Sequence, residues 1–243
     1  YEAGGRVVPP WLERTGAGRI AVRALSHGHR DHAGGAAHLV ERWPVDLALD
    51  PGEPFEEPRY LAWLDRLGQQ GVRWRTVTRG DRWTLGGVQF RVVHPPATWS
   101  GEGRDLNEDS IVLEIRYGEF TALLGGDAGM PAEREFGPSL GRIDVLKVGH
   151  HGSRGATGEA LLDRTRPRLA VVSSGRNGYG HPSPEVLARL AAAGVAVLRT
   201  DHEGTVSVTT DGITFTVRGG RTATTLDARD PTDEAMPCCT PPR

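Results

Sequence analysis

The chain has 243 residues, with 29 basic and 31 acidic side chains and a formal net charge of −2. This length suits one α/β domain with a tail, and no apolar run approaches the roughly 18–20 residues of a membrane helix. No signal peptide is visible at the start, and the near-neutral charge argues against a strongly basic protein that coats nucleic acids. Cys238 and Cys239 are neighbours in a proline-rich segment, which excludes a disulfide framework and a cysteine zinc site.

Apolar runs typical of strands alternate with helical patterns along the chain. Strands are predicted at 20–25, 46–49, 73–78, 87–93, 110–117, 120–125, 143–148, 169–173, 195–199, 205–209 and 212–217. Helices are predicted at 33–42, 57–68, 157–164 and 184–193. The polar segment 94–109 is long for a simple connection, which favours a functional loop. We therefore expect one α/β domain over 1–218 and a disordered tail over 219–243, where Thr, Pro, Asp and Arg dominate without periodicity.

Three histidines and a carboxylate follow the first predicted strand within six residues, as His27, His29, Asp31 and His32. A loop at a strand end can turn all four side chains toward one point. Neutral imidazole and carboxylate are good ligands for zinc and for harder divalent ions such as manganese. A solvated polar loop is the alternative, but so dense a cluster of histidines favours metal binding.

Three later strands also end in candidate site residues. Asp127 follows two glycines, where a carboxylate can bridge two metals or, alternatively, form an Asx turn or helix cap. His150 and His151 follow strand 143–148, and we expect one of them, with His151 favoured, to complete a second metal site. The other would hydrogen-bond the substrate or donate a proton, and an ordinary surface loop is the alternative. His181 lies in the segment NGYGHP, which is typical of a site loop or of a plain turn.

Five segments resemble the metallo-β-lactamase superfamily, and within it the metallo-β-lactamase-like domain of the ComEC family of DNA-uptake competence proteins. They are LSHGHRDHAGG, LNEDSIVLEIRYGEFTALLGGDAG, IDVLKVGHHGS, SSGRNGYGHPSPEVLARL and RTDHEGTVSV. The resemblance implies a four-layer αββα sandwich with a dimetal site at the sheet edges. Family members begin with a β-hairpin before the segment that resembles YEAGG, so this chain is expected to lack that hairpin.

The resemblance also implies a set of ligands. His27 and His29 would hold one metal, Asp31 and His32 the other, Asp127 would bridge them, and His151 or His150 would complete the second site. Many members of the superfamily supply a further histidine to the first site. Here the candidates are His94 and Asn107, and the aligned LNEDS block favours Asn107. Because an amide is a poor zinc ligand, the first site is expected to be weak, open or selective for manganese.

Together these features predict a hydrolase with two divalent ions, Zn²⁺ or Mn²⁺, that uses a metal-activated hydroxide. The favoured substrate is a phosphodiester of DNA, single-stranded or duplex. The candidate catalytic residues are Asp31, His150, Lys147 and His181. Lys147 is the single lysine and lies near the histidine pair, where its charge could meet a phosphate, although an ordinary strand lysine is the alternative.

Arginines give mild support for DNA as a partner. Segment 57–91 holds seven of them, interleaved with Trp63, Trp74 and Trp83, which could stack on bases. A solvated face with core tryptophans is the weightier alternative. Two rival functions also stay open: a hydrolase of small thioesters, lactones or phosphoesters, and a non-catalytic, metal-stabilised DNA-binding module.

The expected oligomeric state is a monomer. If the chain is part of a ComEC-like protein, the membrane segments lie outside it and the domain sits at the outer face of the membrane. A free-standing hydrolase would be cytoplasmic.

Overall fold

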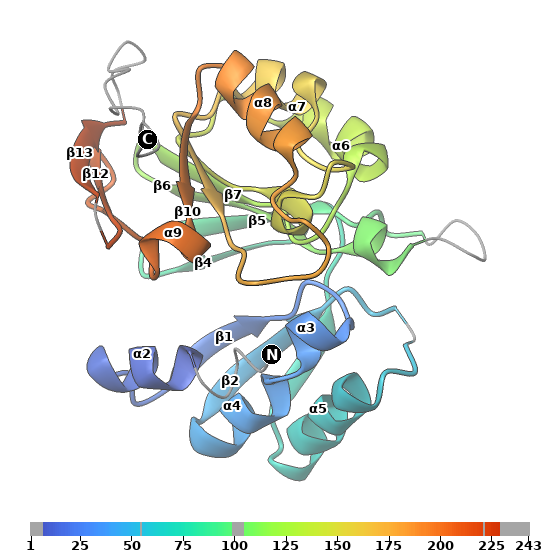
Figure 1. The fold of residues 1–243 in the computed structure, drawn as a ribbon. Coiled ribbons are helices and arrows are strands. Elements are labelled where there is room, and N and C mark those ends of the chain that lie inside the picture. Colours follow the sequence, from blue (N-terminus) through green and yellow to red (C-terminus); the bar gives the residue numbers. More distant parts are fainter. Residues whose placement is uncertain (1–6, 54, 99–104, 221, 229–243) are drawn as a thin grey trace. The chain divides into compact units, whose positions relative to one another are not determined.

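The computed structural model describes residues 7–53, 55–98, 105–220 and 222–228, and the chain divides into two compact units (Figure 1). Unit 1 consists of Tyr1–Thr78 and Pro95–Ile111, and unit 2 of Arg79–His94 and Val112–Arg243. Both units combine helices with sheet, so the predicted α/β class is confirmed. In the described part of the chain, no helix has the length and apolar character needed to cross a membrane.

Unit 1 is built on a parallel sheet of three strands in the order β1-β2-β3. The strands are β1 (Ile20–Ala24), β2 (Val45–Asp50) and β3 (Arg73–Thr76). The helices of this unit are α2 (Val8–Arg14), α3 (Arg30–Ala33), α4 (Ala36–Arg42) and α5 (Pro58–Gln69), with the short 3₁₀ helix η1 (Leu106–Asp109). Helix α5 places Tyr60, Trp63 and Leu67 on one face, and these residues are buried together with Ala48 of β2. This apolar face packs α5 against the sheet.

Unit 2 is built on a sheet of seven strands in the order β10-β9-β8-β7-β6-β5-β4. Strands β4 to β7 pair antiparallel and β7 to β10 pair parallel. The strands are β4 (Arg82–Leu85), β5 (Val88–His94), β6 (Val112–Tyr117), β7 (Phe120–Leu124), β8 (Val145–Lys147), β9 (Leu169–Val172) and β10 (Ala196–Arg199). Because β7, β8 and β9 run parallel, their carboxyl ends lie at one edge of the sheet, and the loops that carry Asp127 and the histidine pair begin there.

Side chains of alternate residues cover the two faces of this sheet. On one face, Leu123 and Leu146 pack with Phe136, Leu161 and Leu190 of the helices. The other face packs on a small antiparallel sheet, β11-β12-β13. The helical elements of unit 2 are α6 (Met130–Phe136), η2 (Gly137–Ser139), η3 (Gly149–Gly152), α7 (Glu159–Thr165), α8 (Pro184–Ala192) and α9 (Thr200–Glu203), and the small sheet consists of β11 (Ser207–Thr210), β12 (Thr214–Arg218) and β13 (Ala223–Asp227).

Several elements differ from the sequence prediction. The helix expected at 33–42 is split into α3 and α4 at Gly34 and Gly35, the residues that end one helix and begin the next. Strand β4 and helices α2 and α6 were not predicted from the sequence, because elements of four to seven residues have too short a hydrophobic pattern to detect. The hairpin of β6 and β7 at Gly118 is confirmed.

The expected tail at 219–243 is wrong for its first part. Residues Ala223–Asp227 form β13, which pairs antiparallel with β12 and buries Leu226 beside Phe215. One apolar residue in a polar, threonine-rich run is too weak a signal to predict an edge strand. The rest of the predicted tail, 229–243 with both cysteines, and the segment YEAGG lie outside the described residues.

Candidate metal centre

In unit 1, the loop after β1 brings the imidazoles of His27 and His29 together with the amide of Asn107. His27 Nε2 lies 3.0 Å from His29 Nδ1, and His29 Nδ1 lies 2.9 Å from Asn107 Oδ1. His27 is buried, with 1% of its surface exposed. Asp105 caps the start of η1, and its side chain accepts a hydrogen bond from the backbone N–H of Asn107.

This donor set suits a divalent ion. Zinc binds histidine nitrogens at about 2.0–2.1 Å, so two nitrogens on one tetrahedral ion lie about 3.3 Å apart. The two ring nitrogens of His27 and His29, at 3.0 Å, are close to that separation. The amide oxygen of Asn107 adds a harder donor, which suits manganese better than zinc.

Serine hydroxyls lie beside the Nδ1 atoms of His27 and His32. Ser110 Oγ and Ser26 Oγ each lie 3.2 Å from His27 Nδ1, and Ser26 Oγ lies 2.9 Å from His32 Nδ1. Metal-binding histidines are commonly oriented in this way, by a polar partner on the nitrogen that does not face the metal. Sequence reasoning did not identify either serine, although Ser26 adjoins the cluster and Ser110 ends the LNEDS block.

Helix α3 carries the other two residues of the first cluster. His32 is largely buried, whereas the Asp31 side chain is 65% exposed and its Oδ2 lies 4.0 Å from His32 Nε2. The exposure leaves the Asp31 carboxylate accessible to a ligand.

His94 and Asn107, the two alternatives for a further ligand, lie in different surroundings. His94 ends β5 in unit 2, is fully buried, and has its ring 5.8 Å from that of Phe136. Asn107 belongs to unit 1, beside His29. The contact with His29 favours Asn107 over His94.

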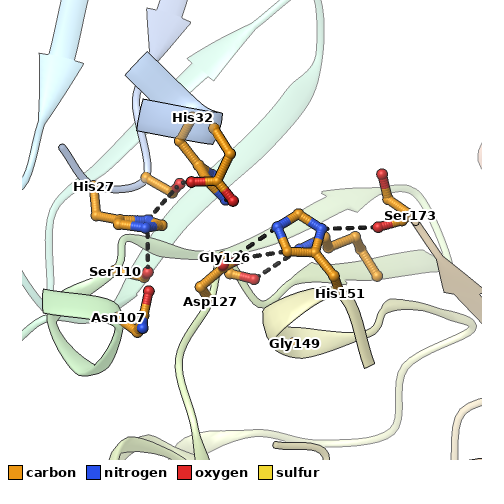
Figure 2. Close-up of polar contacts among 12 residues, drawn as sticks. His27, His32, Asn107, Ser110, Gly126, Asp127, Gly149, His151 and Ser173 are labelled. Atoms are coloured by element: carbon orange, nitrogen blue, oxygen red, sulfur yellow. Dashed lines mark hydrogen bonds and ion pairs between the residues drawn. The ribbon is translucent and has the colours of Figure 1, made fainter. Parts of the chain in front are cut away.

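In unit 2, Asp127 follows β7 through the two glycines Gly125 and Gly126. Its carboxylate is 2% exposed and faces His151, with 3.3 Å between Oδ2 and His151 Nε2 (Figure 2). On its other side, Lys147 Nζ lies 3.6 Å from Asp127 Oδ1 and donates a hydrogen bond of 2.7 Å to the Gly126 carbonyl oxygen. Lys147 therefore points toward the Asp127 turn, not away from it as an ordinary outward-facing strand lysine would.

His151 is oriented through both ring nitrogens. Nδ1 lies 2.8 Å from the carbonyl oxygen of Ser173, so the ring must donate the hydrogen of this bond. Nε2 is left to face Asp127, and the hydrogen bond with that carboxylate raises the pKa of His151 against the opposing effect of burial. A histidine that donates from one nitrogen to a carbonyl presents the other as a metal ligand. Of the two neighbouring histidines, His151 is the one that faces Asp127.

The backbone at this histidine pair is strained. His150 and His151 have φ values of 45° and 52°, in the left-handed region that non-glycine residues rarely adopt. The preceding Gly149 admits no side chain, because a Cβ there would lie 2.8 Å from the Ala128 carbonyl oxygen. Strain of this kind is concentrated at functional sites.

His181 lies near His150, with their ring centroids 5.8 Å apart. Burial lowers the pKa of His181, and the nearby charges of His150 and His151 lower it further. The side chain of Asn177 holds this loop, because its Oδ1 accepts the backbone N–H groups of Tyr179 and His181. Tyr179 is 85% exposed and its ring stacks near that of His181, with 5.9 Å between centroids. These hydrogen bonds fix the shape of the loop.

Comparisons with known proteins agree with these observations. The family model of the metallo-beta-lactamase superfamily matches residues 20–176. The chain is 34% identical over 210 residues to ComE operon protein 3 of Bacillus subtilis, an alignment that covers 85% of this chain and 26% of the relative. It is 35% identical over 201 residues to Recombination protein 2 of Haemophilus influenzae, covering 82% and 23%. The chain therefore spans about a quarter of the length of these relatives.

A solved structure gives the same indication for the fold. The metallo-beta-lactamase fold protein YhfI from Bacillus subtilis aligns with a TM-score of 0.51 at 11% identity, and the alignment covers 79% of this chain and 80% of YhfI. At this identity the likeness concerns the fold alone.

Proposed function

This chain belongs to the metallo-beta-lactamase superfamily, and from that membership we propose that it is a metal-dependent hydrolase that cleaves phosphodiester bonds of DNA. Two groups of candidate ligands carry the proposal: His27 and His29 after β1 with Asn107 of η1 in unit 1, and Asp127 with His151 in unit 2. Each group presents nitrogen and oxygen donors of the kind that divalent ions bind.

From the resemblance to this superfamily we infer that these donors serve two divalent ions. His27, His29 and Asn107 would hold the first ion, and Asp31, His32 and His151 the second. Asp127 would bridge the two. When bound, the ions supply Lewis acidity, lower the pKa of water toward about 7 and neutralise charge on phosphodiester oxygens.

The remaining candidate residues would position these ligands and the substrate. Lys147 holds the Gly126 carbonyl and lies beside Asp127, so its role is to fix the bridging carboxylate. His150, whose ring lies 5.8 Å from that of His181, would donate a hydrogen bond to a substrate oxygen. No protein nucleophile is required by this scheme.

DNA is the proposed substrate because one relative, 35% identical, is named Recombination protein 2 and another, 31% identical, is named Competence protein ComA. Their names describe proteins about four times as long as the matched segment, so the DNA context enters here as a proposal for this chain. A DNA phosphodiester also agrees with the surplus of arginines over lysine, since guanidinium groups pair with phosphates in a bidentate manner.

One panel of assays tests the proposal. The chain is loaded with Zn²⁺ or Mn²⁺ and incubated with linear DNA, a generic phosphodiester and a generic thioester, alongside His29→Ala and Asp127→Ala. We expect cleavage of DNA and of the phosphodiester that both substitutions abolish. Turnover of the thioester alone would contradict the proposal in favour of a small-molecule hydrolase. Metal uptake with DNA binding but no turnover would contradict it in favour of a binding module.

A further inference from the structure

A cavity of about 440 Å³ lies on unit 2 at the edge of the seven-stranded sheet, where β4, β5 and β6 are adjacent. None of the candidate metal ligands lines it. Its charged lining consists of Arg82, Arg91, Arg116 and Glu114. Its volume is in the range of about 300–1,000 Å³ that is typical of small-molecule sites.

The strand register places these charges on one face. Arg82 of β4 is paired with Arg91 of β5, and Arg91 is paired with Glu114 of β6. Arg116 lies two residues beyond Glu114 on the same strand, so its side chain emerges on the same face. Like charges directly opposite each other on antiparallel strands are destabilising. The positive charges of Arg82 and Arg91 therefore repel each other, and a bound anion would reduce this repulsion.

Glu114 contacts two of the three arginines, Arg91 and Arg116, and its single negative charge does not neutralise all three. This carboxylate is 4% exposed and accepts a hydrogen bond of 2.7 Å from Arg91 Nε, while Arg116 Nη2 lies 3.5 Å from its other oxygen. Arg91 also donates from Nη2 to the Ser139 carbonyl oxygen at 3.2 Å, which fixes its guanidinium at the wall of the cavity. Three guanidinium groups share the cavity lining with one carboxylate, and the two exposed ones, Arg82 and Arg116, extend from the ends of the cluster.

We propose that the cavity bounded by Arg82, Arg91 and Arg116 binds the phosphate groups of a nucleic-acid strand. The inference deepens the proposed function and rests on it for the choice of nucleic acid. A guanidinium presents a planar fork of donors that fits phosphate oxygens. Arg91 already donates from Nε and Nη2 within the protein, so the exposed Arg82 and Arg116 would present their guanidinium groups to the phosphates. Arg82 and Arg116 lie on the two strands that flank Arg91, so the cluster is wider than one phosphate and would follow a backbone.

The experiment measures binding, not turnover. The metal-loaded full chain is titrated into a fluorescent, phosphorothioate-linked single-stranded DNA that resists cleavage, across roughly 50–200 mM salt. The slope of log K against log salt falls by about 0.7 for each phosphate of a single strand that the protein no longer neutralises. For Arg82→Ala/Arg116→Ala we expect a slope smaller by about 1.4 and an affinity at least tenfold lower.

Two further variants keep the test sharp. Arg134→Ala/Arg218→Ala removes the same charge from exposed positions elsewhere in unit 2 and should change the slope little. Gln89→Glu introduces one negative charge at an exposed residue of the cavity lining and should weaken binding without altering the fold. Equal effects of the two arginine pairs, or unchanged binding in Gln89→Glu, would overturn the proposal.

A competition experiment distinguishes a site for DNA phosphates from a site for free inorganic phosphate. Inorganic phosphate at the same phosphate concentration should displace the DNA poorly, and equal displacement would overturn the proposal in favour of a small-anion site. Turnover of a generic phosphodiester is measured in parallel, and the Arg134→Ala/Arg218→Ala control should leave it unchanged. If the wild type has no turnover but Arg82→Ala/Arg116→Ala binds the DNA more weakly than the wild type, the proposed function is wrong and the proposed binding site is supported.

Discussion

His151 donates a hydrogen bond from Nδ1 to the carbonyl oxygen of Ser173 at 2.8 Å. The bond turns Nε2 toward Asp127, 3.3 Å away, and distinguishes His151 from its neighbour His150, whose ring lies near His181. A backbone carbonyl thus orients His151 so that its Nε2 faces Asp127.

The first prediction concerns the metal content of the two histidine variants. His151→Ala should lose one of two divalent ions per chain after dialysis, because the variant lacks the nitrogen that faces Asp127. His150→Ala, the matched control, should retain both. Elemental analysis of the purified chains provides the measurement, and the assignment is wrong if His150→Ala is the variant that loses metal.

A second prediction concerns Asn107, whose Oδ1 lies 2.9 Å from His29 Nδ1. Asn107→Leu removes a donor and should weaken zinc binding at the first site about tenfold, or ~1.4 kcal/mol. Asn107→His replaces the amide with an imidazole, a stronger zinc ligand, and should tighten it. Competition with a chromophoric chelator gives both affinities. Identical affinities in the wild type and both variants would exclude Asn107 as a ligand.

Lys147 is predicted to be a positioning residue. Lys147→Met removes the hydrogen bond to the Gly126 carbonyl and leaves the buried Asp127 carboxylate without its nearby ammonium. We expect the free energy of unfolding to fall by about 1–3 kcal/mol. Lys147→Arg keeps a charged donor and should restore part of the stability. Urea unfolding measures both, and unchanged stability in Lys147→Met would support the ordinary strand lysine.

The fourth prediction is a pH dependence in unit 1. The hydroxyl of Tyr60 donates to Asp50 Oδ2 at 2.6 Å, and burial together with this bond raises the pKa of Tyr60 above its ordinary value of 10.0. Above that pH the unfolded chain releases the phenol proton while the folded chain keeps it. The stabilisation is therefore complete below pH 10.0 and is lost as pH rises further, by up to about 1.4 kcal/mol per pH unit.

The variant Tyr60→Phe should remove this slope from the free energy of unfolding, measured in urea between about pH 8 and 11. Tyr179→Phe is the matched control, because Tyr179 is 85% exposed and should leave the slope as it is in the wild type. The interpretation fails if Tyr60→Phe and the wild type lose stability in parallel above pH 10.0.

The positions of the main site residues could be predicted because each follows an apolar strand. His27 follows β1, Asp127 follows β7 through two glycines, and His150 and His151 follow β8. Apolar strand patterns are strong local signals, so the residues that follow each strand can be located from the sequence. The LNEDS block favours Asn107, and the contact with His29 agrees with that choice.

Contacts between distant segments could not be predicted in the same way. The partner of His151 is a backbone oxygen 22 residues further along the chain, and a backbone atom carries no residue-type signal. The cluster of Arg82, Arg91 and Arg116 depends on the register of three strands, and the short strand β4 has no detectable pattern of its own. In the sequence, Arg82 and Arg91 stand out only as members of a basic segment.

The central claim is that this chain hydrolyses DNA phosphodiesters with divalent ions held by these histidines and Asp127. Its most direct measurement is the rate of cleavage of a linear DNA by the wild-type chain and by Asp127→Ala, each titrated with Mn²⁺ or Zn²⁺. We predict cleavage by the wild type that rises with metal to saturation near two ions per chain and is abolished in Asp127→Ala. No cleavage by the metal-saturated wild type, or equal cleavage by Asp127→Ala, would contradict it.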